Sequence, residues 1–394
     1  MARIAIVETY PYEAVWGGEA VYLDRIRQFL VNGGHEVETF VTDVTRGRAD
    51  PRLTLHSKIK NGGHRWHVRH ARKTGPGHHF AFHPGFIGKA LARARGISAP
   101  RVFDISAAEE EWVMRRFASF RPQAAILAFG ACRFTRRIAA SGTPVLASRG
   151  FFSDRRIRLG EAPTAPAVDR RMLDEMRDAA VAGFNNAADI DFYAHATGAT
   201  NGALLGMSFP RRALTAPPAN PPVILFVAAR TKPNIESLRW FLDDGWPVVT
   251  RAFPTARLRV VGTVGSAFAD DASDSVEIVG FADDLDREYA AAQVVIAPFI
   301  SGTGGVKTKV AEALSYGKPL VTTSIGVDPA NPAMFGSAVD VADDPALFGA
   351  AVAELLGNDA LRHQRSVLAI EQYERHFTEA AAYAPLIAML QGVR

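Results

Sequence analysis

Residues 297–323 read APFISGTGGVKTKVAEALSYGKPLVTT, and this stretch decides the fold. An apolar run at 294–297 leads into a glycine-rich turn, after which apolar residues recur at helical spacing. Gly317 and Pro319 end that helix, and the run at 320–323 is typical of a strand. Loop amides and a helix N-terminus in this order are suited to hold a phosphate. With Glu312 inside the helix, the stretch favours a nucleotide whose diphosphate and hydroxyls lie nearby.

Two better-known phosphate motifs come close and fail. A P-loop places glycine directly before its Lys-Ser/Thr pair, whereas Lys307 follows Val306. A dinucleotide fingerprint accounts for Gly302 and Gly304 but needs a third glycine where Lys307 stands. Kinase, NTPase and NAD-dependent functions are therefore disfavoured. A tight turn whose glycines serve only the backbone geometry remains the alternative.

Composition bounds the class of protein. A chain of 394 residues is too long for one ordinary core and predicts two domains. A single cysteine, Cys132, excludes an internal disulfide and any zinc site built on several cysteines. The first residues read as a strand rather than a signal peptide, and no apolar run reaches the roughly 18 residues that span a bilayer. These features predict a cytoplasmic protein.

Charge is divided unevenly along the chain. Residues 1–214 hold 31 basic and 20 acidic side chains, a net charge of +11, and the remainder has a net charge of −7. A basic half favours an anionic partner, such as a membrane surface at the inner face, a lipid phosphate or an acidic polymer. No recognition motif supports nucleic acid. An arginine-rich composition without specific meaning is the alternative.

Strand and helix patterns alternate in both halves. In the first half, strands are predicted at 4–7, 37–42, 124–129 and 143–148, and helices at 19–31 and 132–140. The histidine-rich segment 56–84 predicts a loop or irregular insertion. After a proline-rich linker at 209–222, strands are predicted at 223–228, 258–262, 276–280 and 294–299. A helical stretch at 346–390, broken near Gly357, near 376–378 or at Pro385, ends the chain.

This rhythm predicts the α/β class, with two Rossmann-like, doubly wound domains that face a central cleft. The predicted domains are residues 1–212 and 221–370, and residues 371–394 are a candidate to pack back on the first. Ligands of such sheets bind at the carboxyl ends of the strands, so the cleft is the expected site.

Several segments together resemble the group 1 (family 4) retaining glycosyltransferases, which have the GT-B fold. They are ILFVAARTKPNIESLRWF at 224–241, RLRVVG at 257–262, VEIVGFADDLDREYAAAQVVIAPF at 276–299 and the stretch quoted first. The N-terminal IAIVETYPYEAVWGGEAVYLDRIRQFLVNGGHEVETF resembles the opening strand and glycine loop of that family. The match is strong over about 220 to 330, fair over 1 to 45 and weak between.

The resemblance implies roles for three side chains. Arg230 and Lys232 stand where the family places basic residues on the donor diphosphate, and fixed cations stabilise such a leaving group without a metal. Glu312 matches the second carboxylate of the family's Glu-x7-Glu, which holds the ribose hydroxyls. The first carboxylate is replaced by Gly304, which puts the retaining mechanism and the donor sugar in doubt. The alternatives are a solvated loop for the basic pair and a surface ion pair with Lys309 for Glu312.

Further donor contacts are implied at matching positions. Thr303 and the amides of Gly304 and Gly305 are left to contact the donor, and Lys307 adds a charge near the phosphates. Phe281 lies where the family commonly binds the nucleotide base, with core packing as the alternative. The remaining donor positions are the two glycines of the N-terminal loop, Gly17 and Gly18.

The chain departs from the family pattern at the catalytic positions. The family histidine after the strand at 145–148 is replaced by Arg149, which is a candidate to contact the acceptor or the donor. Glu19 is a candidate base. Asp283, Asp284 and Asp286 resemble a metal-binding Asp-x-Asp, but their place at a helix start favours N-capping. No metal and no cofactor beyond the nucleotide-sugar substrate are expected.

The sequence thus predicts a metal-independent hexosyltransferase that moves a sugar from a UDP- or GDP-linked donor to a glycan, lipid-linked or other acceptor. The expected context is bacterial surface polysaccharide or glycoconjugate synthesis. Two alternatives stay open: a non-catalytic sugar-nucleotide or glycan-binding protein of the same fold, and a sugar-nucleotide 2-epimerase.

Overall fold

The computed structural model describes residues 1–8, 18–41, 64–68, 107–148, 173–212, 218–301, 307–327 and 335–393. Within these ranges, side chains are left undescribed at 18–21, 41, 64–68, 107–109 and 129. The chain divides into two compact units. Unit 1 is Met1–Phe184, Asp189–Ala203 and Pro385–Arg394, and unit 2 is Asn185–Ala188 and Leu204–Ala384. Residues 371–384 therefore belong to unit 2, and the chain returns to unit 1 only from Pro385.

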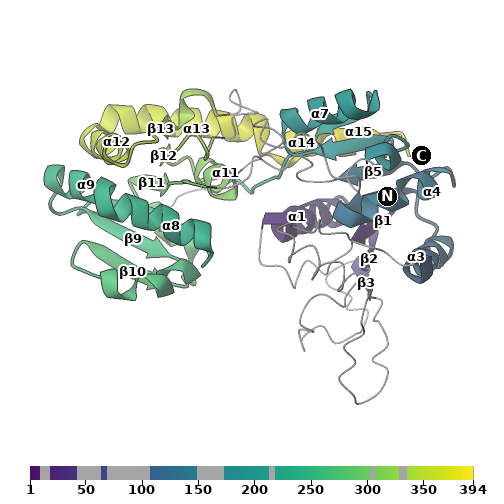
Figure 1. The fold of residues 1–394 in the computed structure, drawn as a ribbon, viewed down its shortest axis with the longest axis horizontal. Coiled ribbons are helices and arrows are strands. Elements are labelled where there is room, and N and C mark those ends of the chain that lie inside the picture. The colour runs from purple at the N-terminus through teal and green to yellow at the C-terminus, as the bar shows by residue number, and fades with distance from the viewer. Residues whose placement is uncertain are drawn as a thin grey trace, which may run out of the picture. The chain divides into compact units, whose positions relative to one another are not determined.

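Unit 1 is built on a seven-stranded sheet, coloured purple to teal in Figure 1. Its strands are β1 (Arg3–Glu8), β2 (Glu36–Val41), β3 (His64–Val68), β4 (Ala124–Ala128), β5 (Val145–Ser148), β6 (Val181–Phe184) and β7 (Gly202–Leu204), in the order β3-β2-β1-β4-β5-β6-β7. The strands from β1 to β6 pair in parallel. Its helices are α1 (Gly18–Asn32), α3 (Ala107–Phe120), η3 (Phe129–Phe134), α4 (Thr135–Ala139), α7 (Ala187–Thr197) and α15 (Ala384–Gln391).

Strand β3 corrects the prediction of an irregular segment at 56–84. Residues 64–68 pair in parallel with β2, although three of the five side chains are histidine or arginine. The strand lies at the edge of the sheet, where charged residues are tolerated because one side of the ladder faces away from the sheet. The rest of the segment lies outside the described residues.

Unit 2 holds a six-stranded, fully parallel sheet. Its strands are β8 (Val223–Val227), β9 (Arg257–Val261), β10 (Val276–Gly280), β11 (Val294–Ala297), β12 (Leu320–Thr322) and β13 (Asp340–Val341), in the order β10-β9-β8-β11-β12-β13. The predicted strands of this half are confirmed. From β8 the chain builds outward on one side to β10, then returns beside β8 and builds outward to β13 on the other. The strand order therefore reverses between β8 and β11.

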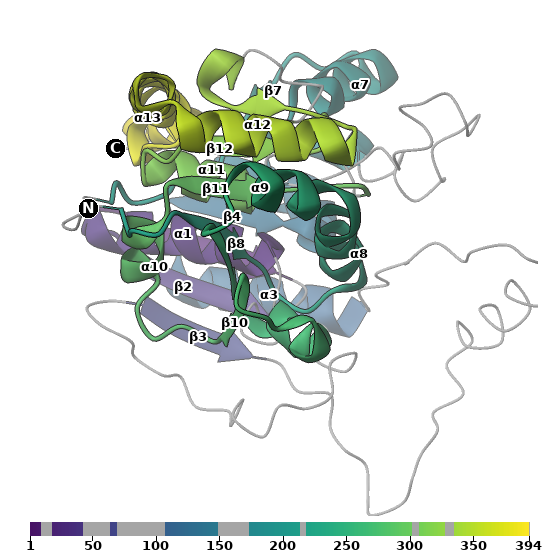
Figure 2. The same cartoon turned by 90° about the vertical axis from the view of Figure 1, so that its left-hand side faces the viewer.

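Helices cover both faces of this sheet. One face packs against α8 (Lys232–Trp240), η4 (Phe241–Gly245), α9 (Trp246–Ala252) and α12 (Pro345–Gly357); Figure 2 shows α8 and α9 together. The remaining helical elements are η5 (Thr263–Ala267), η6 (Ala269–Asp271), α10 (Leu285–Ala291), α11 (Thr308–Ser315), η8 (Gly336–Ala338), α13 (Asp359–His376) and α14 (Glu379–Ala382). Ile224 and Phe226 of β8 join the core under α8 and α12, whereas Leu225 between them is equally buried and points to the opposite face. The doubly wound prediction is confirmed.

Helix ends follow local capping chemistry. The C-terminal helices break at Gly357 and after His376, as predicted, and Asn358 caps α13 through its side-chain oxygen. Asp284 Oδ1 accepts a hydrogen bond of 3.1 Å from the amide of Arg287, which confirms that this aspartate caps α10. No helix in the described ranges is both long and apolar enough to cross a membrane.

Candidate functional site

The carboxyl ends of the unit 2 strands gather the predicted site residues. Because the strands are parallel, the loops that leave β8, β9, β10 and β11 emerge along one edge of the sheet. Open α/β sheets bind their ligands at this edge, beside the point where the strand order reverses. The described residues on it are Arg230, Lys232, Thr263, Phe281 and, on the segment after β11, Lys307, Lys309 and Glu312.

The loop after β8 is tied to the loop after β9. The Arg230 amide donates to Thr263 Oγ1 at 2.8 Å, and the Thr231 hydroxyl caps α8. Gly262 has a φ of +100°, and a Cβ there would lie 2.3 Å from the carbonyl oxygen of Ala228. Only glycine fits this position, so Gly262 allows the two loops to pack closely.

Arg230 and Lys232 are exposed on this tied loop. Lys232 Nζ lies 3.5 Å from Glu236 Oε1 one turn along α8, and 84% of the Lys232 side chain is exposed. An exposed ion pair of this kind contributes little to stability. An anionic ligand could therefore replace Glu236 as the partner of Lys232 at little cost in free energy. The backbone is held while the charged side chains stay free to turn toward a ligand.

Glu312 is held by a buried tyrosine. The Tyr289 hydroxyl donates to Glu312 Oε2 at 3.2 Å, and its ring stacks on that of Tyr316 with centroids 3.9 Å apart and planes 6° apart. Burial, then the charge of Glu312, raises the pKa of Tyr289 well above its usual value. The hydroxyl therefore stays protonated and acts as the donor to the carboxylate.

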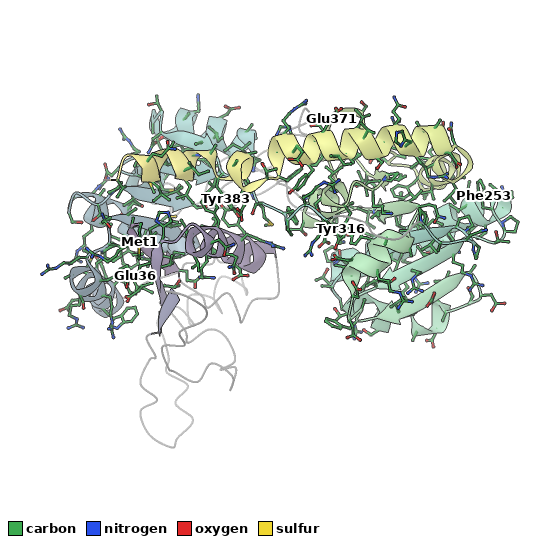
Figure 3. The ribbon with its side chains drawn as sticks, turned by 180° about the vertical axis from the view of Figure 1, so that it is seen from behind. Met1, Glu36, Phe253, Tyr316, Glu371 and Tyr383 are labelled. Atoms are coloured by element: carbon green, nitrogen blue, oxygen red, sulfur yellow. The ribbon has the colours of Figure 1, made fainter. Side chains whose placement is uncertain are left out.

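Asp286 links the stacked ring of Tyr316 to Arg212. The hydroxyl of Tyr316, labelled in Figure 3, donates to Asp286 Oδ1 at 2.5 Å, and Arg212 Nη1 lies 3.3 Å from Asp286 Oδ2. Burial, then the bond to Asp286, raises the pKa of Tyr316. Contacts from separate segments thus fix the α11 face that carries Glu312.

Lys309 lies at the same sheet edge, and the sequence analysis gave it no role in the site. Its Nζ donates to Asn234 Oδ1 at 2.6 Å and lies over the rings of Phe226 and Phe299, 5.1 and 4.8 Å from their centroids. Burial of the ammonium lowers its pKa to about 8. From the sequence, Lys309 was considered only as a surface ion-pair partner of Glu312. Its contact with Asn234 could not be predicted, because Asn234 lies 75 residues earlier and no local spacing relates Lys309 to Asn234.

The structure describes two further residues that were predicted to contact the donor, Lys307 and Phe281. Lys307 occupies the N-cap position of α11, with Nζ 5.9 Å from the ring centre of Phe299. Phe281 follows Gly280, which has a φ of +72°, and is 80% exposed, so core packing does not explain it.

The remaining predicted site residues have no described environment. Gly18 begins α1, and the Glu19 side chain on the same helix is among those not described. The residues outside the described ranges are Gly17, Arg149, Thr303, Gly304 and Gly305. Within the described residues, histidines, cysteines and carboxylates form no group of three that would hold a metal ion.

Residues 221–358 match the family model described as glycosyl transferases group 1. Over these residues the chain is similar to the group 1 glycosyltransferases. The matched segment covers every strand of unit 2 and all of its described site residues from Arg230 to Glu312. A search of curated proteins found no significant match.

Solved structures extend the likeness in fold to the whole chain. A sucrose-phosphate synthase from Thermosynechococcus elongatus has a TM-score of 0.65 at 15% identity, covering 100% of this chain and 99% of the other. HepE from Anabaena, in complex with UDP, has a TM-score of 0.63 at 10% identity, covering 99% and 100%. WaaB, a lipopolysaccharide outer core galactosyltransferase, has 0.59 at 12%, covering 99% of each chain. These likenesses establish the GT-B fold.

The contact between Tyr289 and Glu312 yields a first prediction. Tyr289→Phe keeps the ring stack but removes the donor to the carboxylate, so the affinity for UDP or GDP is expected to fall by about fivefold, near 1 kcal/mol. Isothermal titration calorimetry measures the change. Tyr193→Phe is the control, because it removes a comparable bond of 2.8 Å to Asn201 in unit 1. Equal affinities for Tyr289→Phe and wild type would show that Glu312 does not depend on this bond.

Proposed function

We propose that this protein is a glycosyltransferase that moves a sugar from a nucleotide-diphosphate sugar to a glycan or lipid-linked acceptor in the synthesis of a surface polysaccharide or glycoconjugate. One observation carries the proposal. In the domain that matches the family, a carboxylate held by a buried tyrosine lies on the same sheet edge as two exposed basic residues, Arg230 and Lys232.

Each group has a defined task in the proposed donor complex. Glu312 accepts hydrogen bonds from the two ribose hydroxyls, since an ionised carboxylate is a pure acceptor. Arg230 and Lys232 bind the diphosphate and stabilise the charge that develops as the nucleoside diphosphate departs. The glycine loop, with Thr303, Gly304 and Gly305, contributes amides to the donor on the strength of the sequence pattern.

Phe281 is proposed to stack on the nucleotide base. An aromatic ring that is 80% exposed beside the ligand edge leaves its face open to a base. Phe281→Ala is expected to weaken UDP and GDP binding by roughly tenfold, since base–aromatic stacking contributes about 1–3 kcal/mol, without changing the melting temperature. Leu347→Ala, at an α12 side chain that is 64% exposed, is the matched control. An unchanged dissociation constant for Phe281→Ala would remove Phe281 from the site.

The acceptor is proposed from charge and from the similar structures. The net charge of +11 over residues 1–214 supports an anionic or membrane-borne acceptor met at the inner face of the membrane. A galactosyltransferase of the lipopolysaccharide outer core is among the structures of similar fold, which supports an envelope glycan. Glu19 and Arg149 are kept as proposed catalytic groups next to the acceptor.

The test is a panel of UDP- and GDP-sugars offered with and without lipid-linked and glycan acceptors. Acceptor-dependent release of nucleotide, with a glycosylated product seen by mass spectrometry, is the expected result. Nucleotide binding without turnover on any acceptor would instead support a binding protein of the same fold. An epimerised nucleotide sugar formed without acceptor would support a 2-epimerase.

A further inference from the structure

Lys309 lies where the strand order of the unit 2 sheet reverses. Its ammonium contacts the ring of Phe226, from β8, and the ring of Phe299, which follows β11. These two strands are neighbours, yet the chain continues from them toward opposite edges of the sheet. The crevice at such a reversal is where open α/β sheets bind ligands. Lys309 therefore lies between the two strands that form this crevice.

The hydrogen-bonding capacity of Lys309 is only partly used. An ammonium group has three donors, and among the described residues Lys309 gives one of them, to Asn234 Oδ1. Within those residues no carboxylate lies within ion-pair distance of Nζ; the aromatic rings supply a cation–π attraction only. Lys309 as a residue is part-exposed, although its ammonium is largely desolvated.

The charges around Lys309 favour an anion. On its own segment, Lys307 lies over the same Phe299 ring, and Glu312 lies one turn along α11, where Tyr289 binds it. From α8 the neutral Asn234 faces Lys309, and the charged groups of that helix start are Lys232 and its partner Glu236. Lysines from two segments and the N-terminus of α11 thus converge on one edge.

We propose that Lys309 is a ligand of the donor diphosphate, binding a phosphate oxygen across the crevice between β8 and β11. The inference rests on the proposed function and adds to it a phosphate ligand separate from Arg230 and Lys232. Asn234 orients the ammonium, and the phosphate takes up its remaining donors.

The proposal predicts a pH dependence whose sign follows from burial. In the unliganded protein, desolvation lowers the pKa of Lys309 to about 8. A bound phosphate raises that pKa, so above pH 8 the complex keeps a proton that the free protein has lost. The affinity is therefore complete below about pH 7 and falls as the pH rises through 8, by up to about tenfold per pH unit.

The experiment measures UDP and GDP binding by calorimetry from about pH 7 to about pH 9. Lys309→Met is expected to weaken binding about 10- to 100-fold near neutral pH and to abolish the slope. Lys309→Arg is expected to keep the affinity and also lose the slope, because arginine does not deprotonate. Lys318→Met is the matched control. That lysine also has a pKa near 8, but its Nζ binds the carbonyl oxygens of Ala290 and Ala292.

The outcomes separate this inference from the proposed function. If wild type binds no nucleoside diphosphate, both fail together. If it binds and Lys309→Met retains its affinity and slope, only the role of Lys309 fails. Should Lys309→Met not fold, the slopes of wild type and Lys309→Arg decide.

Discussion

Glu312→Ala is expected to lower kcat/KM roughly 100-fold and to weaken UDP or GDP binding about 30-fold. The carboxylate is proposed to accept both ribose hydroxyls, and a hydrogen bond to a charged group contributes about 1.5–3 kcal/mol. Its removal also leaves the buried hydroxyl of Tyr289 without this acceptor. Nucleotide release with the preferred donor gives the first value, and calorimetry gives the second.

Two further variants make this result specific. Glu312→Gln keeps the shape and removes the charge, so it is expected to fall between wild type and alanine. Glu371→Ala removes an exposed carboxylate of α13, labelled in Figure 3, and is expected to behave as wild type. Wild-type turnover and affinity in Glu312→Ala would show that the ribose is bound elsewhere, whatever the family pattern implies.

Replacing Arg230 and Lys232 together with alanine is expected to lower kcat by about 100- to 1,000-fold. Cations fixed against a departing diphosphate act mainly where charge develops, so their loss affects turnover more than binding. Stability is expected to change by less than about 0.5 kcal/mol, because both side chains are exposed and the ion pair of Lys232 is a surface pair. Single-turnover nucleotide release and thermal melting measure the two effects.

Arg251→Ala is the control for the basic pair, since Arg251 is an exposed cation on α9 in the same unit. It is expected to leave kcat unchanged. A double variant with wild-type kcat would contradict the assignment of the diphosphate to this loop and would support the solvated-loop interpretation of the sequence. A large loss of stability in the double variant would show that the loop depends on these side chains for its conformation.

The strands of unit 2 were predictable because each carries its signal in its own residues. Short buried runs such as Val223–Val227 and Val294–Ala297 are apolar throughout, as parallel strands covered on both faces are. Two other strands, β9 and β10, end at glycines with positive φ, Gly262 and Gly280. Strand β3 was missed because an edge strand rich in histidine and arginine has no such signal.

The candidate site residues that the sequence could identify are those whose position matches the family pattern. Glu312, Arg230 and Lys232 stand at spacings that the family shares, and the structure describes all three at one sheet edge. Phe281 shows the limit of that approach, because its position was equally consistent with core packing and with a ligand contact. The exposure of its ring, a property of its surroundings, excludes core packing and leaves the ligand contact as a proposal.

By itself, the sequence determined the fold class and the order of strands and helices in unit 2, and its resemblance to a family singled out a carboxylate and a basic pair. The elements are local properties, since they depend on periodicity, capping and spacing over a few residues. Only the tertiary structure decided that Tyr289 binds Glu312 and that Lys309 binds Asn234, across 23 and 75 residues of chain. Such contacts depend on which helix faces which strand, and packing of the whole unit sets that.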